Sequence, residues 1–182
     1  MTPIFCSNKL RNLIGSEKMT LFTNETESYP GGWNGHLFAV DRRKCLAFVN
    51  NRSYYAIFIA DILKKDLNNF NELFTNRLIQ QLLFDKIITL KYIPLIKSIQ
   101  SSILLAGTNN DKKTIGTMND FIFQFKVHRE YKYENLNQMD VIKENSLIND
   151  SLTKPREKSN SIYIRPKAEM KELIETYAQH TV

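Results

Sequence analysis

The segment 33–59 constrains the fold more than any other part of the chain. Its first eight residues alternate between the two faces of an extended strand, with Trp33, Gly35, Leu37 and Ala39 on one face and Asn34, His36, Phe38 and Val40 on the other. A polar break at 41–44 precedes the apolar run 45–49, and a second break at 50–53 precedes the apolar run 54–59. Short β-rich runs separated by brief polar breaks predict an antiparallel meander. Because the two later runs are apolar throughout, we expect other elements to cover the sheet on both faces.

Amphipathic segments on both sides of this meander supply the covering elements. A strand is predicted at 3–7, followed by a short helix at 8–14 that Gly15 ends. A last strand is predicted at 162–164. Further helices are predicted from 66 or 68 to about 86, over 93–105, over 114–128 and from Pro166 onwards. The predicted fold is therefore α+β, a small, mostly antiparallel sheet packed against about four helices.

The length and the apolar content set the domain organisation and the environment. The 182 residues fit a single domain, 1–182, and within it we expect the polar segment 131–160 to be flexible. The sequence has no apolar run of the roughly 18 residues that a membrane helix needs, and no secretion signal, so we expect no membrane contact. Cys6 and Cys45 each lie in an apolar stretch, which predicts reduced core cysteines in a cytoplasmic protein.

The sequence lacks the signatures of known catalytic, cofactor and metal sites. His36, His128, His180 and the two cysteines form no spaced pair such as Cys-x-x-Cys, so neither a metal nor a cofactor is predicted. Cys45 follows three consecutive cations that could lower a thiol pKa, but it begins an apolar run and is expected to point into the core. Residues 107–114 bring lysines to a helix start without a phosphate-binding loop signature. Whether the protein is an enzyme stays open at this point.

The charge balance suggests a class of partner. A formal net charge of +6 and a pI of about 9.2 favour a nucleic acid or an acidic protein as the partner. Arg42, Arg43 and Lys44 lie in one polar break and Arg52 lies in the next, which makes these four residues candidates for ligand binding. Successive turns of a meander lie at opposite ends of their shared strand, so the four need not form one patch. Ordinary solvated lysines are the alternative explanation of the charge.

The stretch 33–50, Trp-Asn-Gly-His-Leu-Phe-Ala-Val-Asp-Arg-Arg-Lys-Cys-Leu-Ala-Phe-Val-Asn, resembles the hallmark of an uncharacterised bacterial family, the domain of unknown function DUF6933. Residues 4–13, 115–121 and 163–166 match the family pattern as well, whereas 131–160 is more polar than that pattern. The resemblance implies a shared fold and brings no activity, cofactor or catalytic residue with it. It points to a polar set on an apolar scaffold: Trp33, Asp41, Arg42, Arg43, Asn119 and Asp120.

Three hypotheses follow for this polar set. In the first, the protein is a non-enzymatic binding module that contacts a nucleic acid or an acidic protein through its basic hairpin. In the second, it is an enzyme that acts on a small or phosphorylated substrate in a cleft formed by Asp41, Arg43, Asn119 and Asp120. In the third, Asp41 and Arg43 form buried ion pairs that tie the hairpin to a helix. The positions of these side chains distinguish the hypotheses.

Overall fold

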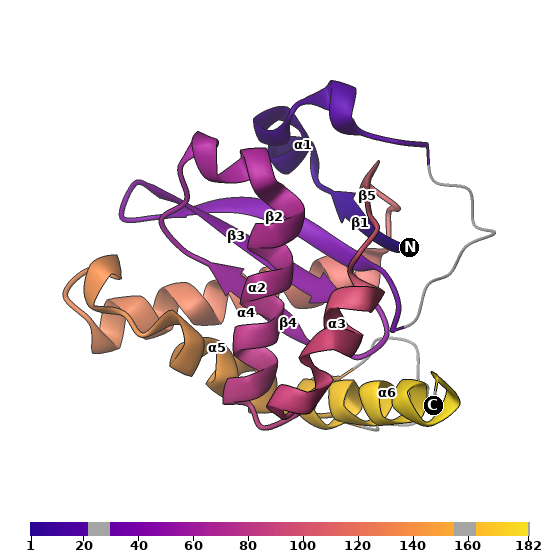
Figure 1. Cartoon of the computed structure of the whole chain (residues 1–182). Helices are drawn as coiled ribbons and strands as arrows, with labels where there is room; N and C mark the ends of the chain where they lie inside the picture. Colours follow the sequence, from indigo (N-terminus) through magenta and orange to yellow (C-terminus); the bar gives the residue numbers. More distant parts are fainter. Residues whose placement is uncertain (22–29, 155–162, 182) are drawn as a thin grey trace.

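The computed structural model describes residues 1–21, 30–154 and 163–181 (Figure 1). The elements in chain order are β1 (Thr2–Cys6), α1 (Asn8–Ile14), η1 (Ser16–Lys18), β2 (Trp33–Val40), β3 (Arg43–Asn50), β4 (Ala56–Ile59), η2 (Lys64–Asn69), α2 (Phe70–Phe84), η3 (Leu90–Tyr92), α3 (Ile93–Ile99), β5 (Ile103–Gly107), α4 (Lys112–Lys132), η4 (Leu136–Gln138), α5 (Val141–Asp150) and α6 (Pro166–Thr181). The η elements are short 3₁₀ helices. The α+β class is confirmed.

The five strands form one mixed sheet in the order β4-β3-β2-β1-β5. Strands β2, β3 and β4 form the predicted antiparallel meander. Strand β1 pairs in parallel with β2 on one side and with β5 on the other, with Ile4 opposite both Trp33 and Leu105. The prediction of a mostly antiparallel sheet was therefore wrong, and within the described residues there are six α-helices where about four were predicted.

The segment predicted as one helix over 93–105 divides into a helix and a strand. Helix α3 ends at Ile99, and β5 begins at Ile103. The strand is fixed by its pairing with β1 along its whole length, and the Thr2 hydroxyl donates a hydrogen bond to the Ile99 carbonyl oxygen (3.1 Å). The apolar residues of 103–106 suit either structure in isolation, so the tertiary pairing decides between them.

Helices cover the sheet on both faces, as the apolar strands predicted. Helices α1, α2, α3 and α6 pack on the face that presents Trp33, Phe48 and Ile57. Helices α4 and α5 pack on the opposite face, where the rings of Phe58 and Phe125 stack with centroids 4.6 Å apart. The alternation in β2 matches this division. Trp33 belongs to the first core, between the sheet and helices α1, α2, α3 and α6. Phe38 and Val40 belong to the second core, between the sheet and helices α4 and α5.

Buried polar contacts attach α5 to the sheet and to α4. The Asn149 carboxamide accepts a hydrogen bond from the backbone N–H of Ala56 (2.7 Å) and donates one to its carbonyl oxygen (3.0 Å). Glu144, which is 1% exposed, accepts hydrogen bonds from Lys132 (2.8 Å) and from the hydroxyl of Tyr133 (2.7 Å). These inward-facing polar residues explain why the sequence of 141–150 shows weak apolar periodicity although it forms a helix. Residues 155–160 at the end of the polar segment, together with 161 and the first residue of the strand predicted at 162–164, lie outside the described residues.

Within the described parts of the chain, none of the helices is both long and apolar enough to cross a lipid bilayer. In place of the predicted last strand, Ile164 forms an isolated antiparallel bridge with Thr153.

Candidate functional site

The parallel strands β1 and β5 create a crevice at their carboxyl ends. After Cys6 the chain continues into α1 on the first-core face, whereas after Gly107 it continues towards α4 on the second-core face. The two strands lie side by side (Figure 1). Where the connections of neighbouring parallel strands leave in opposite directions, the loops separate and open a crevice, which is the common ligand site of parallel sheets.

A cavity of about 220 Å³ lies at this crevice, on the second-core face of the sheet. Four segments form its wall: the end of β1 with the residue after it, the first half of β2, the residue after β5, and the first half of α4. The lining residues are Phe5, Ser7, Asn34, Gly35, His36, Thr108, Ile115, Met118 and Asn119. Asn34 and Met118 are each 2% exposed, whereas Thr108 and Asn119 are exposed. The cavity therefore has a buried floor and a mouth that reaches solvent.

The Asn34 carboxamide on this floor is unpaired. Both its Oδ1 and its Nδ2 are buried, and neither has a hydrogen-bond partner in the part of the chain that the structure describes. Among the described residues, several other buried side chains have one unpaired polar atom, but Asn34 alone has two. Buried carboxamides are normally paired, and each exception calls for an explanation such as a bound molecule. Because Asn34 lines a cavity, an external partner can reach it.

Among the described residues, no carboxylate, lysine or arginine lines the wall of the cavity. Its one readily titratable group is the half-buried imidazole of His36. Burial lowers the pKa of His36 from 6.5, and the positive charges of Lys9 and Lys126 lower it further. The imidazole is therefore neutral at pH 7, and the whole wall offers uncharged donors and acceptors beside apolar groups.

The structure separates the four residues of the predicted enzyme cleft. Asn119 lines the cavity above Asn34, but Asp120 lines a second cavity of about 480 Å³ between α4 and the segment 152–154. Asp41 contacts Arg129, which lies ten residues, or about 15 Å, further along α4 than Asn119. Arg43 pairs with Asp61, next to the end of β4. No shared cleft gathers these side chains.

Asp41 ties the β2–β3 hairpin to α4. Asp41 and Arg42 have φ values of 50° and 63°, as in the tight I′ turns that suit twisted hairpins. The carboxylate of Asp41 accepts hydrogen bonds from Nε of Arg129 (2.8 Å) and from the backbone N–H of Leu136 (2.8 Å), and it forms an ion pair with Nη2 of Arg129. This is the joint of the third hypothesis, although the pair is about a quarter exposed rather than buried, and Arg43 has no part in it.

The basic residues of the predicted hairpin interface lie at two places. Arg42 and Lys44 are exposed near the β2–β3 turn, whereas Arg52 is exposed in the turn between β3 and β4, at the opposite end of β3. Arg43 is partly exposed and pairs with Asp61. Trp33 is fully buried and packs edge-to-face on Phe74, with centroids 5.3 Å apart, so its role is in the core.

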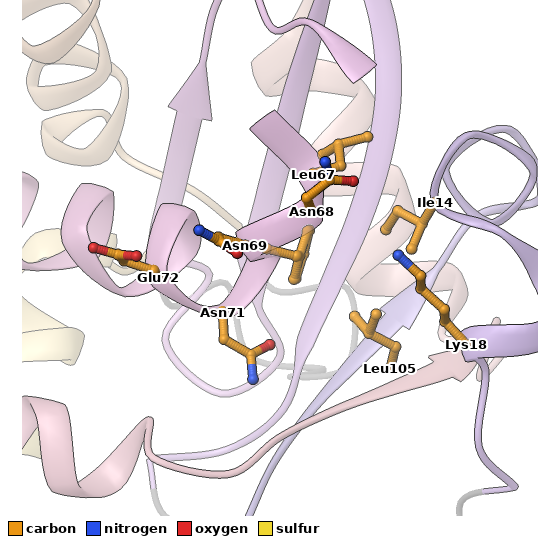
Figure 2. A pocket seen from close by; sticks show the side chains of 9 residues that line it. Ile14, Lys18, Leu67, Asn68, Asn69, Asn71, Glu72 and Leu105 are labelled. Atoms are coloured by element: carbon orange, nitrogen blue, oxygen red, sulfur yellow. The ribbon is translucent and has the colours of Figure 1, made fainter. Parts of the chain in front are cut away.

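A larger, open cavity of about 540 Å³ lies between α1 and η1, the start of α2, and β5. Figure 2 shows Lys18 and Glu72 on opposite sides of this cavity, with Asn69 and Asn71 between them. All of these polar side chains reach solvent. Because water can form hydrogen bonds with these side chains, this cavity gives no evidence for a ligand comparable to the unpaired Asn34 carboxamide of the smaller cavity.

Metal and thiol chemistry have no candidate site in the described residues. Within ranges 1–21, 30–154 and 163–181, no three His, Cys, Asp or Glu side chains come close enough to hold a metal ion. Cys6 and Cys45 are free and buried. Burial raises the pKa of Cys6 to about 12 and also raises the pKa of Cys45, so neither thiol ionises readily at neutral pH.

Of the residues that form the cavity, Asn119 alone was predicted from the sequence as a ligand-binding residue, and His36 was considered there as a metal ligand. Asn34 was missed, although the sequence carries a signal for it, a carboxamide at the second position of a strand on the same face as Phe38 and Val40. The contribution of Thr108 depends on the parallel strand β5, which was read as part of a helix.

Comparisons with known proteins place the chain in a family. The model of the family described as "Domain of unknown function (DUF6933)" matches residues 3–169. Neither the search of curated proteins nor that of solved structures gives a match. The family match covers the sheet from Pro3 onwards, the cavity and the hairpin joint, and the chain belongs to the DUF6933 family.

Proposed function

We propose that this protein binds a small molecule in the cavity above Asn34. The observation that carries the proposal is the Asn34 carboxamide, which is 2% exposed and unpaired at both polar atoms on the floor of a cavity that opens to solvent. An unpaired buried polar group costs about 1–3 kcal/mol, and a ligand that pairs it recovers that cost. The position of the cavity at the carboxyl ends of β1 and β5 supports the proposal independently.

Binding without catalysis fits this wall better than an enzyme does. General acid–base chemistry needs a proton donor and a proton acceptor placed around a reacting group. The cavity offers one titratable imidazole and no carboxylate. The enzyme alternative that the sequence suggested, with Asp41, Arg43, Asn119 and Asp120 as its residues, gains no support because those side chains are dispersed.

A fragment screen followed by thermal unfolding tests the proposal. Compounds that raise the melting temperature of the wild-type chain are expected to lose that effect in Asn119→Ala, which alters the mouth of the cavity. Asp120→Ala is the matched control, because the neighbouring residue is equally exposed but lines the other cavity. Hits that respond equally to both substitutions, or no hits at all at millimolar concentration, would contradict the proposal.

We also propose, as a second function, that the hairpin tip contacts a nucleic acid or an acidic protein. The observation in its favour is that Arg42 and Lys44 are exposed beside a turn whose conformation the Asp41 joint fixes. Arg42→Ala with Lys44→Ala is expected to weaken binding to an oligonucleotide or an acidic protein, and to reduce the salt dependence of a nucleic-acid complex. The single substitution Arg52→Ala, at the opposite end of β3, serves as the control.

A cytoplasmic location is part of the same proposal. The two buried, unpaired thiols of Cys6 and Cys45 support a reducing compartment. Fractionation of the native host followed by immunodetection tests this location, and recovery of the protein in an oxidising compartment would contradict it.

A further inference from the structure

We infer that the ligand of the Asn34 cavity is a nucleobase, or a flat heterocycle with the hydrogen-bonding edge of one. This inference rests on the proposed function and names the class of ligand. It follows from the charge of the wall, the two free atoms of Asn34, the apolar side walls and the size of the cavity.

The charge of the wall requires a neutral group at the floor. No lysine, arginine or carboxylate lines the cavity, and His36 is neutral at pH 7. A carboxylate or phosphate pushed down to Asn34 would be buried without a counter-charge, which is strongly unfavourable. Anionic ligands are therefore excluded from the floor, although a charged substituent can project from the mouth.

The two free atoms of Asn34 specify the edge of the ligand. A carboxamide offers a donor at Nδ2 and an acceptor at Oδ1, side by side, and here both are unpaired. The group that satisfies both at once has an acceptor next to a donor, in the same plane. Asparagine pairs with adenine in this way, through the N6 amino group and N7 of the base. The amide and amino edges of other nucleobases present the same pairing.

The remaining wall suits a flat ring. Phe5 lies opposite Asn34 in the register of β1 and β2, and Met118 and Ile115 of α4 add apolar surface. The volume of about 220 Å³ is below the range of roughly 300–1,000 Å³ that drug-sized ligands occupy. A single base therefore suits the cavity, and any sugar or phosphate would lie at the mouth, beside Thr108 and Asn119.

A nucleobase could come from a free base or nucleoside, or from a nucleotide or a single strand. Lys9 and Lys126 are exposed and are close enough to His36 to lower its pKa. These cations would attract the phosphate of a nucleotide, so their removal separates the two sources. A free base would bind with little dependence on Lys9, on Lys126 or on salt, whereas a phosphorylated ligand would depend on all of them.

Titration of the isotope-labelled full chain, followed by NMR, tests the inference. The probes are adenine, cytosine and uracil, with indole as a ring of similar shape that lacks the paired edge. The side-chain amide signals of Asn34, assigned by their absence in Asn34→Leu, are expected to shift on addition of at least one base and not with indole. Affinity for that base is expected to fall about 5- to 150-fold in Asn34→Leu, which corresponds to the loss of one bidentate pair, and to be unchanged in Asp120→Asn.

The same titration then shows whether the base comes from an unphosphorylated or a phosphorylated ligand. The probes are the nucleoside, its monophosphate and a short single strand. Each is added to the wild type and to the double variant Lys9→Ala with Lys126→Ala. Failure of every base, while other compounds shift Asn34, would overturn the nucleobase inference and leave the proposed function standing. Failure of all compounds to shift Asn34 would overturn both. Equal binding of indole and of the bases would show that the cavity recognises apolar shape alone, which also contradicts the inference.

Discussion

Replacement of Asn34 by leucine is expected to make the ligand-free protein more stable. Asn34 is 2% exposed, so both polar atoms of its carboxamide lose their contact with water on folding. Neither atom forms a hydrogen bond among the described residues that would offset this desolvation cost. Leucine has a similar shape and suits the apolar face that Phe38 and Val40 form in the same strand. Removing an unsatisfied buried group of this kind is worth about 1–3 kcal/mol. For a chain of this length, that free energy corresponds to a rise in melting temperature of roughly 2–12 °C.

Asn50 provides a matched control for this substitution. It is 0% exposed, but its Oδ1 accepts hydrogen bonds from the backbone N–H (3.0 Å) and the hydroxyl (3.1 Å) of Ser53, and its Nδ2 donates to the carbonyl oxygen of Gly32 (3.3 Å). Asn50→Leu leaves two buried donors of Ser53 without partners, so a loss of about 2–6 kcal/mol is expected. Two buried asparagines at the same end of the β2–β3 strand pair are thus expected to give opposite signs for the same chemical change.

Urea unfolding of the wild type, Asn34→Leu and Asn50→Leu, monitored by circular dichroism, measures the change in the free energy of unfolding that each substitution causes. A loss of 1 kcal/mol or more in Asn34→Leu would refute the reasoning. It would mean that Asn34 is satisfied in the free protein, for example by a tightly held water, and that the carboxamide is structural. In that event the case for a ligand at the floor of the cavity would fail together with the stability argument.

Three further predictions concern the contacts that hold the fold together. Asp41→Ala is expected to lower the free energy of unfolding by about 1–3 kcal/mol, and a double-mutant cycle with Arg129→Ala is expected to show coupling, because the carboxylate accepts charge-assisted hydrogen bonds. Glu144→Gln is expected to destabilise the protein at pH 7 and progressively less as the pH falls below 4.5. Burial tends to raise the pKa of Glu144, but its hydrogen bonds and neighbouring positive charges outweigh burial and hold the pKa below 4.5, so its contribution is fully present above 4.5 and is lost as the pH falls through the lowered pKa. Asn149→Ala is expected to cost about 1–3 kcal/mol and to speed hydrogen exchange at the Ala56 amide, which donates a hydrogen bond to the Asn149 carboxamide (2.7 Å). Equal pH dependence of Glu144→Gln and wild type, or unchanged exchange at Ala56, would contradict the respective prediction.

The local pattern of the sequence predicts the meander well because alternation and turn chemistry are local properties. Strand β2 has the predicted bounds, and the two turns that follow it lie at the predicted breaks. Strand β5 was missed for the opposite reason: five apolar or small residues suit a helix or a buried strand, and only their pairing with β1, about a hundred positions earlier, decides. An error in one strand then changed the sheet from mostly antiparallel to mixed and hid the crevice.

The hairpin charges illustrate why a basic run is a weak guide to function. Asp41, Arg42, Arg43 and Lys44 are consecutive, yet the structure gives them separate surroundings. Asp41 holds the end of α4, Arg43 pairs with Asp61, and Arg42 and Lys44 are exposed. The sequence shows that these charges are neighbours along the chain, but the turn geometry and the contacts with distant elements decide where each one points.

Within the described residues, the fold offers the Asn34 carboxamide no hydrogen-bond partner. The backbone on either side of it is committed to the sheet, since Asn34 pairs with Phe5 of β1 and with Val49 of β3. Ile115 and Met118 of α4 are apolar, and the polar side chains of the cavity wall, those of Ser7, His36, Thr108 and Asn119, form no hydrogen bond with the Asn34 carboxamide. An aliphatic residue at this position would complete the second core and remove the desolvation cost, so the fold has no need of a carboxamide here. Under the proposed function, the group that pairs with this carboxamide is a ligand, and the cavity gives that ligand access.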